Sequence, residues 1–362
     1  MEWLKLTPVT LGWNRSREWL HDRGSSQDKE SRVVRDVFVT GGTGFIGAHV
    51  VRSLLAANYR VRALVRPQSR LDNLAGLDIE TVTGDVNSPE LVQLMQGCDA
   101  VCHVAAHYSL WRRDRDRLHQ VNVLGTRHVL ESAQAAGVER VVYTSSVAAI
   151  GVKPGGQVAD ETYQSPPHRL ISAYKQSKYW AEQEAHRAIE RGQDIVIVNP
   201  STPIGPRDIK PTPTGDIIRR FLQRQMPAYV NTGLNFIDVR DVARGHVLAL
   251  ERGKTGERYI LGHQNLSFKA FLDKLAHHSG LEAPRYTVPL WLPLAVAWVD
   301  EILLSKLGKS PSVPLDGVRM SAEPMYYDAS KAVRELGLPQ SNLDEAIAAA
   351  INWMGKKGIE KM

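Results

Sequence analysis

The sequence predicts an α/β fold, a doubly wound parallel sheet followed by a smaller C-terminal lobe. Short runs rich in Val, Ile and Ala alternate with helical segments, which is the pattern of parallel β–α–β units. The runs are almost continuously apolar, as is typical of strands covered by helices on both faces. A glycine cluster at 41–47 separates the first run from the first helix, as in folds that bind ligands at the carboxyl ends of parallel strands.

The predicted elements follow one another closely up to residue 200. We expect strands at 37–39, 60–65, 80–83, 100–104, 141–144 and 195–198, and helices from the glycine cluster to about residue 58 and at 89–95, 121–136 and 173–191. After Pro200 the pattern loosens into a proline-rich loop and shorter segments. We therefore expect residues 35–202 to form the sheet domain and 203–362 to form mainly a substrate-binding lobe, with some segments returning to the sheet.

Composition restricts the function classes. The 362 residues are 43% hydrophobic and 23% charged, as in soluble globular proteins, and the net charge of +6 is spread along the chain. This favours a small anionic ligand over nucleic acid. Cys98 and Cys102 are too few for a disulfide framework, and His103 and His107 add no ligand pattern typical of a metal site, so we expect no metal and a reducing cytoplasm.

Two segments lie outside this pattern. Residues 1–34 contain no sustained apolar run, so we interpret them as a disordered or amphipathic extension and not as a secretion signal. Residues 286–299 form a stretch of 14 uncharged residues, too short to span a bilayer. The first interpretation of this stretch is a helix packed in the lobe, and the second is peripheral contact with a membrane surface.

Glycines 41, 44 and 47 have the spacing G-x-x-G-x-x-G. They allow a tight turn, close approach of a pyrophosphate and close packing of helix on strand, so the loop predicts a dinucleotide site. Arg66 follows the second predicted strand, where an arginine can pair with a 2′-phosphate, and Arg70 lies close behind. NADP(H) is therefore favoured as the cofactor, and NAD(H) stays open.

Tyr174 and Lys178 lie four residues apart and should share one face of a helix. We expect the lysine and the nicotinamide charge to lower the pKa of the phenol, so that Tyr174 exchanges a proton with a carbonyl or carbinol oxygen. A serine of TSSVAAIG, which follows the fifth strand, would hold that oxygen; the residues alone do not choose between Ser145 and Ser146. After the third strand, Asp85 would accept the adenine amino group.

The motifs GGTGFIG, GDV, HVAA, YTSSVAAIG, YKQSK and VNPSTPIGPRD, in this order, resemble the extended short-chain dehydrogenase/reductase family, the NAD-dependent epimerase/dehydratase group. Longer segments such as VAAHYSLW and NPSTPIGPRDIKPTPTG are similar to the bacterial hopanoid-associated sugar epimerases, which are also called dihydroflavonol-4-reductase-like. The resemblance implies an NAD(P)-binding Rossmann fold. It also implies a catalytic set of Ser146, Tyr174 and Lys178, and a homodimer built from helices 121–136 and 173–191.

The resemblance also assigns the cofactor site. It implies contacts from the pyrophosphate loop (Gly41, Thr43, Gly44, Phe45, Ile46, Gly47), the adenine site (Asp85, Val86), the ribose site (Val104, Ala105, Ala106, with Tyr174 and Lys178) and the nicotinamide site (Pro200, Ser201). Epimerases of this family usually carry an acidic residue after the second strand and retain NAD. The arginine at position 66 departs from that pattern and favours a reductase that exchanges NADP(H).

Four residues are expected at the substrate. Tyr108 and Trp111 could stack on a ring, and Arg207 and Lys210 could meet an anionic group. Three functions stay open. The first is hydride transfer to or from a sugar-like or lipid-linked (hopanoid-pathway) substrate. The second is an NAD-retaining nucleotide-sugar epimerase or dehydratase, and the third is a non-catalytic dinucleotide sensor or scaffold.

Overall fold

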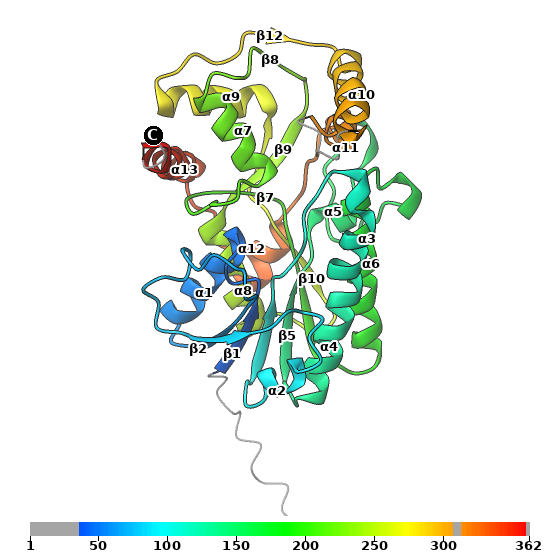
Figure 1. Cartoon of the computed structure of the whole chain (residues 1–362), viewed down its shortest axis with the longest axis vertical. Helices are drawn as coiled ribbons and strands as arrows, with labels where there is room; N and C mark the ends of the chain where they lie inside the picture. The colour runs from blue at the N-terminus through cyan, green and yellow to red at the C-terminus, as the bar shows by residue number, and fades with distance from the viewer. Residues whose placement is uncertain (1–35, 307–312, 360–362) are drawn as a thin grey trace, which may run out of the picture. The chain divides into compact units, whose positions relative to one another are not determined.

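The computed structural model describes residues 36–306 and 313–359 (Figure 1). Residues 34–362 form one compact unit. The extension expected at 1–34 lies outside the described residues.

A seven-stranded parallel sheet forms the centre of this unit, in the order β10-β6-β5-β4-β1-β2-β3. The strands are β1 Asp36–Thr40, β2 Arg60–Val65, β3 Glu80–Thr83, β4 Ala100–His103, β5 Arg140–Thr144, β6 Ile195–Pro200 and β10 Arg258–Leu261. The strands expected up to residue 198 are all present, with ends shifted by one or two residues. The doubly wound sheet is thus confirmed.

Helices cover both faces of the sheet (Figure 1). On one face lie α1 Phe45–Ala56, α8 Val239–Arg252 and α12 Ser330–Leu336; on the other lie α2 Leu91–Met95, α4 Gly125–Ala135 and α6 Ala173–Glu190. Successive side chains of a strand point to opposite faces. Val37 and Val39 of β1 therefore pack with the first helix group, whereas Phe38 packs with the second.

The helix expected at 121–136 is present, but its first turn is π-helical. Residues His119–Leu124 form a π-helical turn, η2, before α4 begins. Within this turn the buried side chain of Asn122 bonds to the backbone of His107, accepting from its N–H at 2.7 Å and donating to its C=O at 2.9 Å. π-Turns of this kind are frequent at functional sites.

The helix expected at 89–95 begins only at Leu91, because residues 88–91 form a turn.

Short helices surround the carboxyl ends of the strands. They are η1 Arg112–Asp114, α3 Arg115–Leu118, α5 Val147–Ile150, η3 Pro154–Gly156 and η4 Pro167–Arg169.

The smaller lobe has its own core, in which Phe236 and Phe271 stack at 4.4 Å between ring centroids. Its sheet is formed by β7 Thr202–Ile204, β9 Gly233–Asp238 and β11 Gln264–Ser267, and it is packed by α7 Pro213–Leu222, α9 Phe268–Ser279 and α13 Leu343–Ile359. A two-stranded pair, β8 Ala228–Tyr229 with β12 Tyr286–Thr287, leads to α10 Trp291–Lys306 and α11 Leu315–Met320. Among the described helices, none is both long and apolar enough to cross a membrane.

Candidate active site

The glycine loop between β1 and α1 forms a narrow cradle. Gly41 has φ +72°, and a Cβ there would lie 2.6 Å from the backbone N of Ala105, just beyond β4. A Cβ on Gly47 would lie 2.1 Å from the carbonyl oxygen of Gly41. Gly44 caps α1 without a side-chain hydrogen bond, and the first turn carries no acidic residue. The first N–H groups of α1 are therefore available to an anion.

The other residues predicted at the cofactor lie at the same edge of the sheet. Val104 and Ala105 donate backbone hydrogen bonds to Thr40, at the end of β1. Pro200 ends β6, and the hydroxyl of the next residue, Ser201, is buried without a partner among the described residues. A glycine cradle, an uncapped helix and an orphaned hydroxyl together fit a dinucleotide.

Asp85 and Val86 follow β3 as expected. The Asp85 carboxylate accepts hydrogen bonds from the backbone and side-chain nitrogens of Asn87 at 3.1 and 3.2 Å, and the Val86 carbonyl accepts one from His128. The contact of Asp85 and Val86 with adenine stays a prediction.

Arg66 lies directly after β2 and is exposed. Arg70 pairs with Asp72 at 3.0 Å, whereas no ion pair involves Arg66 within 36–306 and 313–359. The guanidinium of Arg66 is thus available to a phosphate.

The three predicted catalytic residues converge. Lys178 is buried, and its Nζ donates to the carbonyl oxygen of Thr144, at the end of β5, at 2.8 Å. Ser146 caps α5 and accepts a hydrogen bond from the N–H of Ala148 at 3.1 Å. Tyr174 lies in the first turn of α6, and the nearby Ser146 side chain acts to lower the pKa of its phenol. The structure thus brings Ser146 to the phenol.

The phenol of Tyr174 is removed from water. Burial raises the pKa of Tyr174 to about 12, although the Ser146 side chain acts in the opposite direction. Burial also lowers the pKa of Lys178 to about 8, which the negative charge of Glu182 opposes. In the chain by itself, Tyr174 is therefore protonated at neutral pH. The lowering of its pKa by Lys178 together with a bound nicotinamide stays a prediction.

A buried network that the sequence analysis missed supports the site. The Glu182 carboxylate accepts hydrogen bonds from Arg258 of β10 at 2.9 Å and from Asn199 of β6 at 2.8 Å. The Asn199 side chain also donates to the carbonyl oxygen of Ser146 at 3.0 Å. Glu182 lies one helical turn after Lys178, so its position could have been inferred, but Arg258 is 76 residues away and no sequence pattern connects the two.

Replacing Glu182 with glutamine should lower the free energy of unfolding by about 3–5 kcal/mol, because the change leaves the largely buried Arg258 without its counter-charge. Chemical denaturation would measure this. Glu282→Gln is the matched control, since Glu282 and its partner Arg285 are both exposed, and we expect no measurable change there. Equal stability of the two variants would contradict a supporting role for the network.

The predicted substrate residue Tyr108 lies against Tyr174, with ring centroids 4.5 Å apart. Asn122 fixes the segment that carries Tyr108, since it bonds to the backbone of His107 and donates to Ser177 of α6 at 2.9 Å. Sequence reasoning did not find Asn122, because nothing in the pattern distinguishes it from a solvated helical residue. The structure thus places the Tyr108 ring against Tyr174, the candidate proton donor.

The other predicted substrate residues are more dispersed. Trp111 is half-buried beyond Tyr108, and the charge of Lys210 contributes to lowering the pKa of His107, which places that lysine near the same segment. The Arg207 guanidinium instead lies over the ring of Trp353, 5.6 Å from its centroid. Contact of these residues with a substrate stays a prediction.

The cysteines near β4 and the histidine at its end are buried in the protein interior. Cys98 and Cys102 are free and buried. His103 is buried between the hydroxyls of Thr40 and Thr126, at 2.7 and 3.1 Å, and burial lowers the pKa of its imidazole to about 3. In the part of the chain that the structure describes, no group of three or more His, Cys, Asp or Glu side chains is arranged to hold a metal ion.

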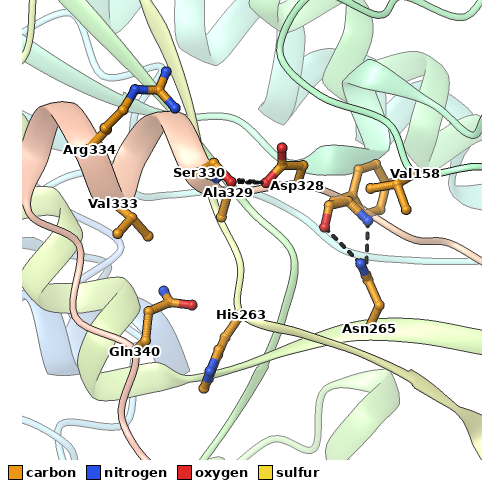
Figure 2. Close-up of a pocket in the computed structure, with 10 residues that line it drawn as sticks. Val158, His263, Asn265, Asp328, Ala329, Ser330, Val333, Arg334 and Gln340 are labelled. Atoms are coloured by element: carbon orange, nitrogen blue, oxygen red, sulfur yellow. Dashed lines mark hydrogen bonds between the residues drawn. The ribbon is translucent and has the colours of Figure 1, made fainter.

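A separate pocket of about 590 Å³ lies between β11 and the start of α12 (Figure 2). Asn265 and Asp328 line it, together with His263, Arg334 and Gln340. None of Ser146, Tyr174 and Lys178 lines it, so this pocket is not the site at which the catalytic residues converge.

The sequence matches the model of the NAD-dependent epimerase/dehydratase family over residues 37–262. A Synechocystis sp. protein provisionally named a dihydroflavonol 4-reductase is 66% identical over 90% of this chain and 96% of its own length. Sterol demethylase protein B of Methylococcus capsulatus is 33% identical over 89% of this chain and 98% of its own. Among solved structures, the crystal structure of gox2253 is 43% identical, covers 89% of this chain and 98% of that chain, and superposes with a TM-score of 0.80.

Proposed function

The chain belongs to the NAD-dependent epimerase/dehydratase family, and from this premise we propose that it is an NADP(H)-dependent oxidoreductase that reduces a carbonyl group of a sugar-like or lipid-linked substrate, or oxidises the corresponding alcohol. One observation carries the proposal. Ser146 and Tyr174 lie together at the edge of the sheet where Lys178 is anchored and where the glycine cradle lies.

Each of these side chains has a role in the proposed reaction. The nicotinamide, when bound, supplies or takes up the hydride. Tyr174, protonated at neutral pH, gives its proton to the oxygen that becomes negative as the carbonyl carbon is reduced. Ser146 donates a hydrogen bond to the same oxygen. Lys178, held by the carbonyl of Thr144, supplies a positive charge that favours the phenolate left behind.

Two observations favour a reductase over an epimerase. An available arginine at position 66 suits a 2′-phosphate and therefore a cofactor that is reduced elsewhere and exchanged at every turnover. The name of the Synechocystis relative, a reductase, supports the same direction.

Cofactor preference tests the proposal. The purified chain should carry no stoichiometric NAD(H) and should bind NADPH about 10–100-fold more tightly than NADH, because the charge-assisted hydrogen bonds to a phosphate contribute about 1.5–3 kcal/mol. Arg66→Glu should remove this preference. Arg70→Gln is the matched control, since Arg70 is already paired with Asp72. Calorimetric titration would give the dissociation constants.

The outcomes separate the alternatives. Stoichiometric NAD(H) retained through purification would contradict the proposal and favour a nucleotide-sugar epimerase or dehydratase. Binding of NADPH without turnover of any ketone in a panel of flavonoid, sterol and sugar carbonyl compounds would favour a dinucleotide sensor or scaffold.

A further inference from the structure

The helix α10 presents an apolar face to solvent. Among the residues of α10 whose side chains the structure describes, the exposed ones fall within roughly 160° of the helix circumference at 100° per residue. They are Trp291, Leu292, Ala295, Val296, Trp298, Val299 and Ile302. The two tryptophans are 67% and 60% exposed, and none of the seven is charged. Nearby Tyr286 of β12 is 75% exposed.

The acidic side chains of the same helix lie away from this face. Asp300 and Glu301 are half-buried, and the Asp300 carboxylate accepts the N–H of Val313 at 2.8 Å. Ala297, on their side of the helix, is fully buried. A surface helix ordinarily turns its apolar stripe to the core and its charges to water. Because α10 instead leaves a set of large apolar side chains in water, its outer face indicates contact with an apolar surface that is not part of the described chain.

Positive charge lies beside this face. α11 packs against α10 (Figure 1), and its buried Asp316 faces the guanidinium groups of Arg112 and Arg319 at 3.5 and 3.6 Å. The Asp316 carboxylate thus lies between two guanidinium groups, and both arginine side chains are about half exposed. The segment 112–117, which includes Arg112, contains four exposed arginines, the exposed Asp116 and the half-buried Asp114. Because Asp300, Glu301 and Asp316 are buried or half-buried, the exposed charge on the elements beside α10 is mainly positive.

The same elements border the candidate active site. Tyr108, against Tyr174, is followed by Leu110, which lies so close to α11 that a Cβ on Gly317 would be 3.1 Å from it. Arg112 then pairs with Asp316 of α11. A continuous series of contacts thus leads from the candidate proton donor to the helix with the exposed apolar face.

We propose that the outer face of α10, together with Tyr286, docks on an anionic membrane surface. Tryptophan and tyrosine favour the headgroup level of a bilayer, where an apolar ring and a polar atom are both satisfied. Arginines beside them attract anionic headgroups. The face is one side of a single helix, which suits shallow insertion in the interface. A further consequence, which rests on the proposed function, is that the carbonyl substrate is an apolar compound dissolved in the membrane.

Vesicle flotation tests the docking without reference to activity. The full chain should float with vesicles of phosphatidylcholine and phosphatidylglycerol, less with phosphatidylcholine alone, and less as salt is raised. Trp291→Ala/Trp298→Ala should lower the partition coefficient by about tenfold or more. The matched control is Trp180→Ala, which removes a 44% exposed tryptophan from α6 and should float like the unaltered chain. Because all three side chains are exposed, the thermal unfolding midpoint should change little.

Three results would overturn the proposal. The first is that the unaltered chain stays with the soluble fraction at every lipid composition. The second is that the double variant floats as well as the unaltered chain. The third is that, without vesicle binding, sedimentation shows a dimer that the double variant converts to a monomer, which would assign the face to a second copy of the chain. Failure of the carbonyl-reduction assay would overturn the proposed function and leave the flotation result standing.

Discussion

Tyr174→Phe should lower kcat for carbonyl reduction by about 10²–10⁴-fold and leave the dissociation constant for NADPH nearly unchanged. The change removes only the hydroxyl beside Ser146 and keeps the ring that packs against Tyr108, with 4.5 Å between ring centroids. The steady-state loss of NADPH absorbance with any ketone that the unaltered chain reduces would measure the fall in kcat. Calorimetric titration would measure cofactor binding.

Tyr179→Phe supplies the control, because Tyr179 lies on the same helix and its ring contacts Trp180 instead of the catalytic residues. In the oxidative direction the rate of the unaltered enzyme should rise with pH, since the phenolate fraction of Tyr174 increases as the pH approaches a pKa of about 12. The Tyr174→Phe variant should lack this rise. An unchanged kcat in that variant would remove Tyr174 from the chemistry.

Gly41→Ala should weaken NADPH binding by about 100-fold or more, equivalent to about 2.7 kcal/mol. The added Cβ would lie 2.6 Å from the backbone of Ala105, so the loop and the end of β4 must separate. That separation moves the N–H groups at the start of α1 away from the pyrophosphate, and each charge-assisted hydrogen bond to it contributes about 1.5–3 kcal/mol.

Gly76→Ala isolates the effect of the clash from that of backbone strain. Gly76 has φ +73°, close to the +72° of Gly41, but a Cβ there would meet nothing within 4 Å. Both variants should lose about 1–2 kcal/mol of stability from the left-handed backbone conformation. Only Gly41→Ala should bind NADPH poorly in a titration. If both variants bound NADPH equally well, the glycine loop would not be the pyrophosphate site.

The first six strands of the sheet could be predicted from the sequence because each carries its own local signal, a short apolar run next to a turn or a helix. The π-turn before α4 had no such signal, and within it Asn122 bonds to the backbone of the distant His107. The return of β10 to the edge of the sheet was expected only in outline, because pairing with β6 is a contact between distant parts of the chain.

The candidate site also contains features that the sequence predicts and features that it does not. The spacing of Tyr174 and Lys178 and the glycine triplet are local patterns, and the structure places these residues at one edge of the sheet. The raised pKa of Tyr174 could not be predicted, because it depends on how tightly distant segments enclose the phenol. For the same reason no pattern revealed that Arg258 pairs with Glu182 beneath Ser146.

The position of β10 has a consequence for engineering new specificity. β10 lies between two segments of the smaller lobe in the sequence, yet it completes the central sheet beside β6. A chimera with a single crossover after residue 202 would therefore import a foreign edge strand along with the foreign lobe, and it would replace Arg258, the partner of Glu182. A lobe exchange that preserves the parental sheet needs two further junctions, one on each side of 239–261, so that α8 and β10 stay with the scaffold.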